Sequence, residues 1–132
     1  MHRGEFGAAI TSYRAALSLD PSYPSPRFNL ALASLQSGDP TTAQSELSIL
    51  LEAHPYHPNA RLLSAQARLQ SSDFTGAIQD AQLVIESNGN DAGAHALLGT
   101  AFIASGDVPA GEASLCRAKA LGHAGVPLPC EG

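Results

Sequence analysis

Hydrophobic residues recur along this chain at the spacing of an amphipathic helix, and polar breaks interrupt them regularly. Within residues 41–53, Ala43, Leu47 and Leu50 fall on one helical face. The same spacing predicts a lone helix near 5–19, followed by helices near 25–37, 41–53, 59–71, 74–87, 93–105 and 109–121. The alternation typical of β-strands is not found in the sequence, so the pattern predicts an all-α fold.

The pattern repeats every 34 residues without a gap. A small residue followed by an acidic one recurs at Gly4-Glu5, Gly38-Asp39, Ser72-Asp73 and Gly106-Asp107. Because Asp39, Asp73 and Asp107 share one phase at the start of a helix, we predict N-caps rather than catalytic carboxylates. Gly38 is expected to end the preceding helix in a left-handed conformation. A fixed period of this length predicts a solenoid, in which each helix pair buries its apolar face against its neighbours.

These residues resemble the tetratricopeptide repeat (TPR), over about residues 4–121. The matching positions are Gly4-Glu5-Phe6, Ala9, Tyr13, Ala16, Pro21, Leu30-Ala31, Gly38-Asp39, Ala43, Pro55, Ala65, Asp73-Phe74, Ala77, Leu98-Gly99, Phe102, Gly106-Asp107 and Ala118. The resemblance implies a right-handed superhelical solenoid of antiparallel helix pairs. It gives a TPR domain over residues 1–121, with a half-repeat at 4–23 and repeats at 24–57, 58–91 and 92–121. A Gly/Pro-rich tail occupies residues 122–132.

The chain departs from the family where large aromatic side chains or alanine are usual. The departures are Arg27, Arg61, His95, Ser34, Arg68 and Gly111. They leave the repeat phase intact, and they predict looser packing at those places.

The resemblance implies that ligands lie on a concave face lined by the first helix of each repeat. The positions that correspond to ligand contacts are Phe28, Asn29, Leu32, Asn59, Leu62, Gln66, Leu69, Thr100 and Ile103. This surface is apolar or carries side-chain amides, which offer a donor and an acceptor to a peptide backbone. The alternative is that individual leucines among them belong to the core.

One TPR subfamily holds C-terminal carboxylates with a clamp of lysine, asparagine and arginine. Asn29 occupies the asparagine position, but Asn59 and Leu63 stand where the cations should be. Without fixed cations a carboxylate gains little, so the clamp is rejected.

The first helix carries an apolar face, formed by Phe6, Ile10, Tyr13 and Leu17, that a preceding helix would normally cover. Two explanations stay open. The chain is a piece of a longer array or multidomain protein, or this face pairs with a second copy to give a homodimer.

Composition restricts the partners. Seven lysine and arginine residues against twelve acidic ones give a net charge of −5, which disfavours nucleic-acid binding. The apolar runs are too short for direct membrane insertion, and the N-terminus lacks the apolar run of a signal peptide. A cytoplasmic location is therefore expected.

Reactive residues are few. His54 and His57 stand three apart without an accompanying acidic or cysteine cluster, so they predict a solvated turn rather than a metal site. His95 is predicted to be a satisfied histidine at the edge of the core. A bond between Cys116 and Cys130 is conceivable if the tail folds back, but free thiols are expected in cytosol.

No catalytic residue or cofactor site is predicted, and the sequence indicates a non-enzymatic adaptor that binds a protein or peptide. One alternative is a regulatory or targeting segment of a larger enzyme or multidomain protein. The other is a self-assembly module that dimerises through its uncapped first helix.

Overall fold

The computed structural model describes residues 3–20, 22, 24–123 and 130, with the backbone alone for residues 3–6. The described part contains helices and no strand. The helices are α1 (Arg3–Leu19), α2 (Pro24–Gln36), α3 (Pro40–Ala53), α4 (Pro58–Gln70), α5 (Phe74–Ser87), α6 (Ala92–Ser105) and α7 (Val108–Ala120). Every predicted helix is present, with its ends within two residues of the expected ones, so the all-α prediction is confirmed.

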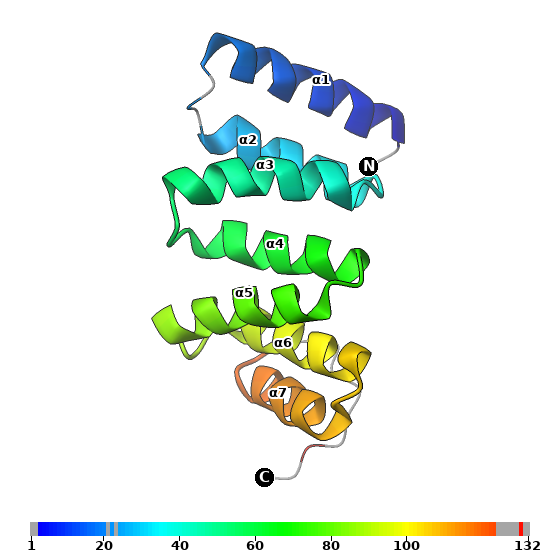
Figure 1. The fold of residues 1–132 in the computed structure, drawn as a ribbon, viewed down its shortest axis with the longest axis vertical. Coiled ribbons are helices and arrows are strands. Elements are labelled where there is room, and N and C mark those ends of the chain that lie inside the picture. Colours follow the sequence, from blue (N-terminus) through cyan, green and yellow to red (C-terminus); the bar gives the residue numbers. More distant parts are fainter. Residues whose placement is uncertain (1–2, 21, 23, 124–129, 131–132) are drawn as a thin grey trace.

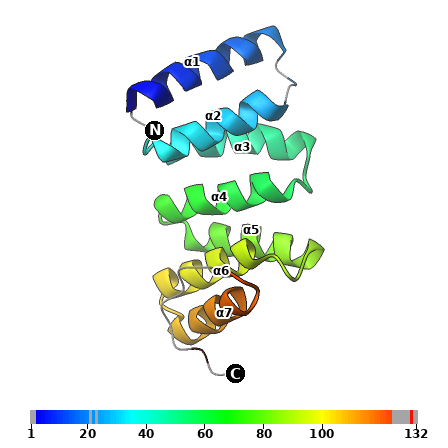
Figure 2. The same cartoon turned by 180° about the vertical axis from the view of Figure 1, so that it is seen from behind.

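The helices form a single stack from α1 to α7 (Figure 1). In that view α3 lies in front of α2 and α5 in front of α6, and the order is reversed when the stack is seen from behind (Figure 2). At these two places a first helix of a repeat therefore lies on one side and a second helix on the other. This two-sided arrangement is what a repeated helix pair produces when each pair packs on the next.

Aspartates begin the second helices, as predicted. A side-chain oxygen of each cap accepts the backbone N–H three residues later, for example Thr42 at 3.1 Å from Asp39 and Gly76 at 3.0 Å from Asp73. Asp107 caps α7 in the same way. The Thr42 hydroxyl holds the pKa of Asp39 below its usual value. The Gly76 N–H, followed by Arg68, lowers the pKa of Asp73.

The turn before each second helix needs a left-handed residue. Gly38 and Gly106 have φ of 88° and 103°, which confirms the prediction for Gly38. Ser72 occupies the same repeat position with φ of 62°. A side chain in this region costs free energy that glycine avoids.

The core is built mainly of alanine and leucine. One buried cluster joins α2, α3 and α4 through Ala31, Leu35, Ala43, Leu47, Leu50, Ala60, Leu63 and Ala67. Small side chains let neighbouring helices approach closely, so the apolar faces of successive pairs merge into one continuous core.

Gly111 does not loosen the packing, contrary to the expectation. A Cβ atom on Gly111 would lie 2.7 Å from the carbonyl oxygen of Gly99, and one on Gly99 would lie 2.8 Å from the carbonyl oxygen of Gly111. The backbones of α6 and α7 meet at this point. Glycine is required there because any side chain would push the two helices apart.

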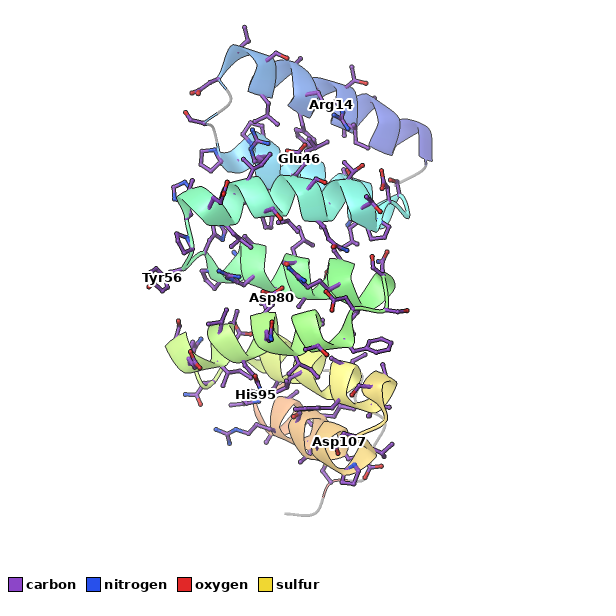
Figure 3. The ribbon with its side chains drawn as sticks, in the orientation of Figure 1. Arg14, Glu46, Tyr56, Asp80, His95 and Asp107 are labelled. Atoms are coloured by element: carbon purple, nitrogen blue, oxygen red, sulfur yellow. A yellow bond between two sulfur atoms is a disulfide. The ribbon has the colours of Figure 1, made fainter. Side chains whose placement is uncertain are left out.

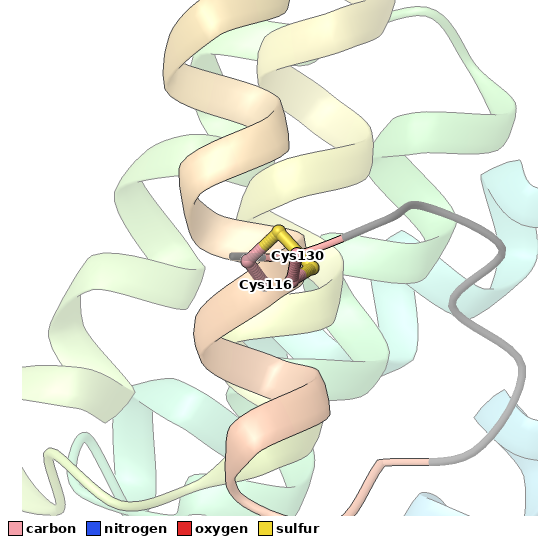
Figure 4. Close-up of a disulfide and its surroundings, with 2 residues drawn as sticks. All are labelled: Cys116 and Cys130. Carbon is pink, nitrogen blue, oxygen red and sulfur yellow. A yellow bond between two sulfur atoms is a disulfide. The ribbon is translucent and has the colours of Figure 1, made fainter. Parts of the chain in front are cut away.

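Cys116 and Cys130 form a disulfide with a Cα–Cα distance of 5.5 Å (Figure 4), so the expectation of free thiols is wrong. The reason lies at the end of α7. Gly122 adopts φ of 97°, and the N–H of His123 donates to the carbonyl of Ala118 at 3.0 Å. This cap turns the chain back toward the helix. A crosslink of this kind is typical of oxidising compartments.

The predicted behaviour of the tail falls largely on residues 124–129 and 131–132, outside the described residues. Within the part that the structure describes, no helix combines the length and the hydropathy needed to cross a bilayer.

Candidate protein-binding groove

The candidate groove residues lie on α2, α4 and α6, and none of them is fully buried. Asn59, Gln66, Thr100 and Ile103 are exposed. Half-buried positions are Phe28, Asn29, Leu32, Leu62 and Leu69. Leu35, at a neighbouring face of α2, is 5% exposed and belongs to the core. The candidate leucines thus keep surface that a ligand could cover.

Phe28 and Leu32 pack at the margin of the buried cluster on α2, α3 and α4. Leu69 packs in the same manner against a second cluster formed by Ala65, Ala77 and Ala101. Each apolar side chain therefore supports the core with one part and presents another part outward. Such side chains are held in place before any ligand arrives.

The charged side chains of these first helices pair with the second helices. α2, α4 and α6 contain no acidic residue, and their only lysine or arginine residues are Arg27, Arg61 and Arg68. Arg27 forms an ion pair with Glu46 on α3. Arg61 pairs with Asp80 on α5 at 3.2 Å. The cations of the groove-forming helices are thus neutralised by carboxylates from the second helices.

Asp80 is the centre of a buried polar network between α4 and α5. It is 4% exposed. One carboxylate oxygen accepts the hydroxyl of Ser64 at 2.7 Å and faces Arg68 Nε at 3.1 Å. The other accepts Arg61. A buried carboxylate is tolerated when its oxygens are satisfied in this way.

The network explains two departures from the family pattern. Arg61 and Arg68 occupy positions where aromatic side chains are usual, and their guanidinium groups reach the carboxylate of Asp80 instead. Arg68 also binds Asp73 Oδ2 at 2.7 Å. Gly76 leaves room for it, since a Cβ there would lie 2.9 Å from Arg68 Cδ. The expected looseness is thus replaced by a polar contact.

A pocket of about 340 Å³ lies between the starts of α2 and α4. It brings together three groove candidates, Phe28, Asn29 and Asn59, with His54 and His57. The ring of His57 stacks on Phe28 with centroids 5.8 Å apart and planes at 16°. An aromatic wall with amides beside it suits a side chain that is partly apolar and partly polar.

His57 has a structural role that the sequence reasoning missed. Its Nδ1 accepts the N–H of Ala60 at 3.1 Å, so it is the N-cap of α4. The available signal was the repeat phase, because 34 residues later Asp91 caps α6. His54 is exposed, as a solvated turn predicts. Among the described residues, no three His, Cys, Asp or Glu side chains come together as a metal site.

His95 is satisfied, as predicted. It is half-buried, and its Nε2 lies 2.9 Å from the carbonyl oxygen of Gly89. Since a carbonyl only accepts, Nε2 carries the proton in this contact.

The candidate self-association face lies on α1. Ile10, Tyr13 and Leu17 are half-buried, whereas the side chain of Phe6 lies outside the described residues. The positions equivalent to Tyr13 in the next two repeats are more deeply buried. Leu47 and Ala81, at the position of Tyr13, are 1% and 0% exposed. The helix that would cover α1 in a complete repeat has no counterpart among the described residues.

Comparison with known proteins supports the repeat assignment. The family model described as TPR repeat matches residues 1–38, and the one described as tetratricopeptide repeat matches residues 28–92. No curated protein sequence matches the chain.

Solved structures share the fold. A crystal structure of MamA is 21% identical, with a TM-score of 0.84, and the match covers 91% of this chain and 70% of that one. MamA 41-end from Desulfovibrio magneticus RS-1 is 18% identical, with a TM-score of 0.83, covering 89% and 67%. TTC0263, a thermophilic TPR protein in Thermus thermophilus, is 22% identical, with a TM-score of 0.79, covering 90% and 67%. At such identities the similarity establishes the fold alone.

Proposed function

Because the chain belongs to the tetratricopeptide repeat family of protein-interaction scaffolds, we propose that it binds an uncharged peptide or helix of a partner protein along α2, α4 and α6. The observation that carries this proposal is the pairing of Arg27, Arg61 and Arg68 with carboxylates of other segments. The first helices are left with apolar and amide side chains for the ligand.

Affinity then comes from burial and from backbone hydrogen bonds. Covering the remaining surface of Leu32 and Leu62 contributes about 25 cal/mol for each Å² of apolar area removed from water. The exposed amides of Asn59 and Gln66 can each donate to and accept from a peptide backbone. A partner with alternating apolar and neutral polar side chains fits this surface best.

Selection from a display library of short random peptides tests the proposal. Enriched peptides are expected to be apolar and uncharged, and their affinity should stay constant from low salt to about 0.5 M NaCl. Screening weakens interactions between exposed charges, and the arginines of the first helices are already paired with carboxylates of this chain. Enrichment of charged peptides whose binding falls with salt contradicts the proposal.

Variants locate the binding face. Leu32→Glu and Leu62→Glu should abolish capture of a selected peptide, while far-UV circular dichroism stays unchanged. Ile49→Glu is the matched control, because Ile49 is 47% exposed on the second helix α3. It introduces the same charge on the other side and should leave affinity unchanged. Capture that survives both groove variants refutes the groove.

The uncovered face of α1 favours a second candidate function, self-association. Ala9, Tyr13 and Ala16 are half-buried, whereas their counterparts 34 residues later are at most 2% exposed. Sedimentation velocity should then show a dimer that Tyr13→Glu converts to monomer. A monomer at every concentration of the unmodified chain refutes it.

A further inference from the structure

The first two repeats share an ion pair that the third repeat lacks. Arg27 pairs with Glu46, and Arg61 pairs with Asp80, in each case across 19 residues. The corresponding residues of the third repeat are His95 and Ser114, since 114 − 95 = 19. Figure 3 shows Glu46, Asp80 and His95 at successive levels of the stack. The level of the third repeat therefore keeps a basic side chain, His95, but has serine in place of the acidic residue.

A hollow of about 630 Å³ occupies this third level, between α5 and α7. Its polar lining consists of Gln82, Glu86, His95, Ser114 and Arg117. Most of these residues come from second helices, so the hollow lies apart from the candidate groove.

The same hollow recurs 68 residues, or two repeats, earlier. There a space of about 360 Å³ is lined by Arg14, Ser18, Arg27, Leu30 and Glu46, the counterparts of Gln82, Glu86, His95, Leu98 and Ser114. In the earlier hollow the Arg27–Glu46 pair is in place. At the level between them, Asp80 is buried with Arg61 and Ser64. Only at the third level is the internal carboxylate replaced by a short hydroxyl.

The hydrogen-bond donors at the third level are poorly used. The guanidinium of Arg117 contacts Asn90 Oδ1 at 3.4 Å, which is long for a hydrogen bond. Among the described residues, Ser114 Oγ has no hydrogen-bond partner. Glu86 is exposed at the rim, and no described ion pair joins it to Arg117. A cation and a hydroxyl thus line a space in which the one carboxylate, that of Glu86, forms no described ion pair with Arg117.

We propose that this hollow binds a carboxylate of a partner protein, an Asp or Glu side chain in an acidic segment. That carboxylate takes the place filled internally by Glu46 and Asp80. Arg117 supplies a charge-assisted hydrogen bond. Ser114 donates its hydroxyl, as Ser64 does to Asp80 at 2.7 Å. The site is separate from the groove, so an adaptor of this design would hold a neutral segment and an acidic one at once.

The first test is an NMR titration with capped glutamate (N-acetyl-glutamate amide), in which only the side chain is charged. Capped glutamine is the isosteric control. Saturable shifts of the backbone amides of Gln82, Ser114 and Arg117 are expected with glutamate, in the millimolar range usual for one charged contact, and not with glutamine. Equal shifts with both probes, or no saturable shift with glutamate, overturn the proposal.

Variants assign the chemistry. Arg117→Gln should lower the affinity for capped glutamate at least about tenfold. Glu86→Gln should raise this affinity, because it removes a like charge beside the bound carboxylate. Arg14→Gln is the control, because Arg14 lines the earlier hollow, where Glu46 already provides the carboxylate. Unchanged affinity in Arg117→Gln, or an equal loss in Arg14→Gln, refutes the assignment.

The decisive variant restores the internal pair. His95→Arg together with Ser114→Asp recreates at the third level the arrangement of Arg61 and Asp80. This double variant should no longer bind capped glutamate. It should also unfold at a higher temperature than the parent, and its thermal unfolding transition shows that the variant is folded. Retained binding in a folded double variant overturns the proposal.

Discussion

Replacing Asp80 tests whether the polar network between α4 and α5 stabilises the fold. Asp80→Ala removes the common partner of Arg61, Arg68 and Ser64. Breaking a fully buried pair costs about 3–5 kcal/mol. The side chains of Arg61 and Arg68 remain 25% and 36% exposed, so water can rehydrate them in part. We therefore expect a loss of about 2–3 kcal/mol in the free energy of unfolding.

The companion variant separates pairing from desolvation. Replacing Arg61 and Asp80 together by leucine removes both charges and restores apolar side chains of suitable volume. Such replacements are often neutral or stabilising. The double variant should therefore be more stable than Asp80→Ala, although it should stay below the parent because Ser64 and Arg68 also lose Asp80 as a partner.

Urea unfolding followed by circular dichroism measures both effects, and a constant m-value shows that the same surface is exposed. A double-mutant cycle over Arg61 and Asp80 then gives their coupling energy. A loss below about 0.5 kcal/mol in Asp80→Ala would mean that the network contributes no more than a surface ion pair does. That result would contradict a stabilising role for Asp80.

Further substitutions test three other features of the fold. Gly111→Ala should lower the free energy of unfolding in urea by about 1–3 kcal/mol, because its Cβ would meet the backbone of α6. Gly7→Ala is the control. A Cβ there meets nothing within 4 Å, so alanine should raise the free energy of unfolding by about 0.5–1 kcal/mol. Because the pKa values of Asp39 and Asp73 are lowered in the folded state, their carboxylates stabilise the fold fully above their ordinary pKa of 3.8. This stability is lost as the pH falls through the folded pKa. The free energy of unfolding should therefore depend less steeply on acid pH in D39N and D73N than in the parent. Cys130→Ser should lower stability by up to about 3 kcal/mol, since the disulfide closes a loop across a sequence separation of 14 residues; an unchanged urea midpoint on reduction would argue against it.

The helices and the aspartate caps of the second helices could be predicted because their causes are local. Hydrophobic spacing, an aspartate before the helix and a glycine after it act within one or two turns. The aspartate caps illustrate this, since Asp39 and Asp73 bind N–H groups only three residues away. Such contacts can be identified from a single sequence.

The ion pairs were missed because each joins residues on different helices. In the sequence, Arg27 and Arg61 stand out only as departures from an aromatic position, and no local pattern marks Glu46 or Asp80. Their common separation of 19 residues shows the relation once the repeats are aligned. The disulfide was missed for a different reason, because it depends on the direction in which the chain leaves α7 after Gly122.

The departures at His95 and Gly111 belong to one structural solution in the third repeat. In the second repeat, α4 and α5 are joined by arginine side chains that reach the carboxylate of Asp80. In the third repeat, α6 and α7 meet instead at backbone level, through Gly99 and Gly111. Helices held this closely do not need a long cation and an acid between them, so a histidine and a serine suffice at positions 95 and 114. The loss of those long side chains leaves the hollow beside α7 unfilled. Close packing of the last pair through Gly99 and Gly111 and an open hollow beside His95 and Ser114 therefore occur together in the third repeat.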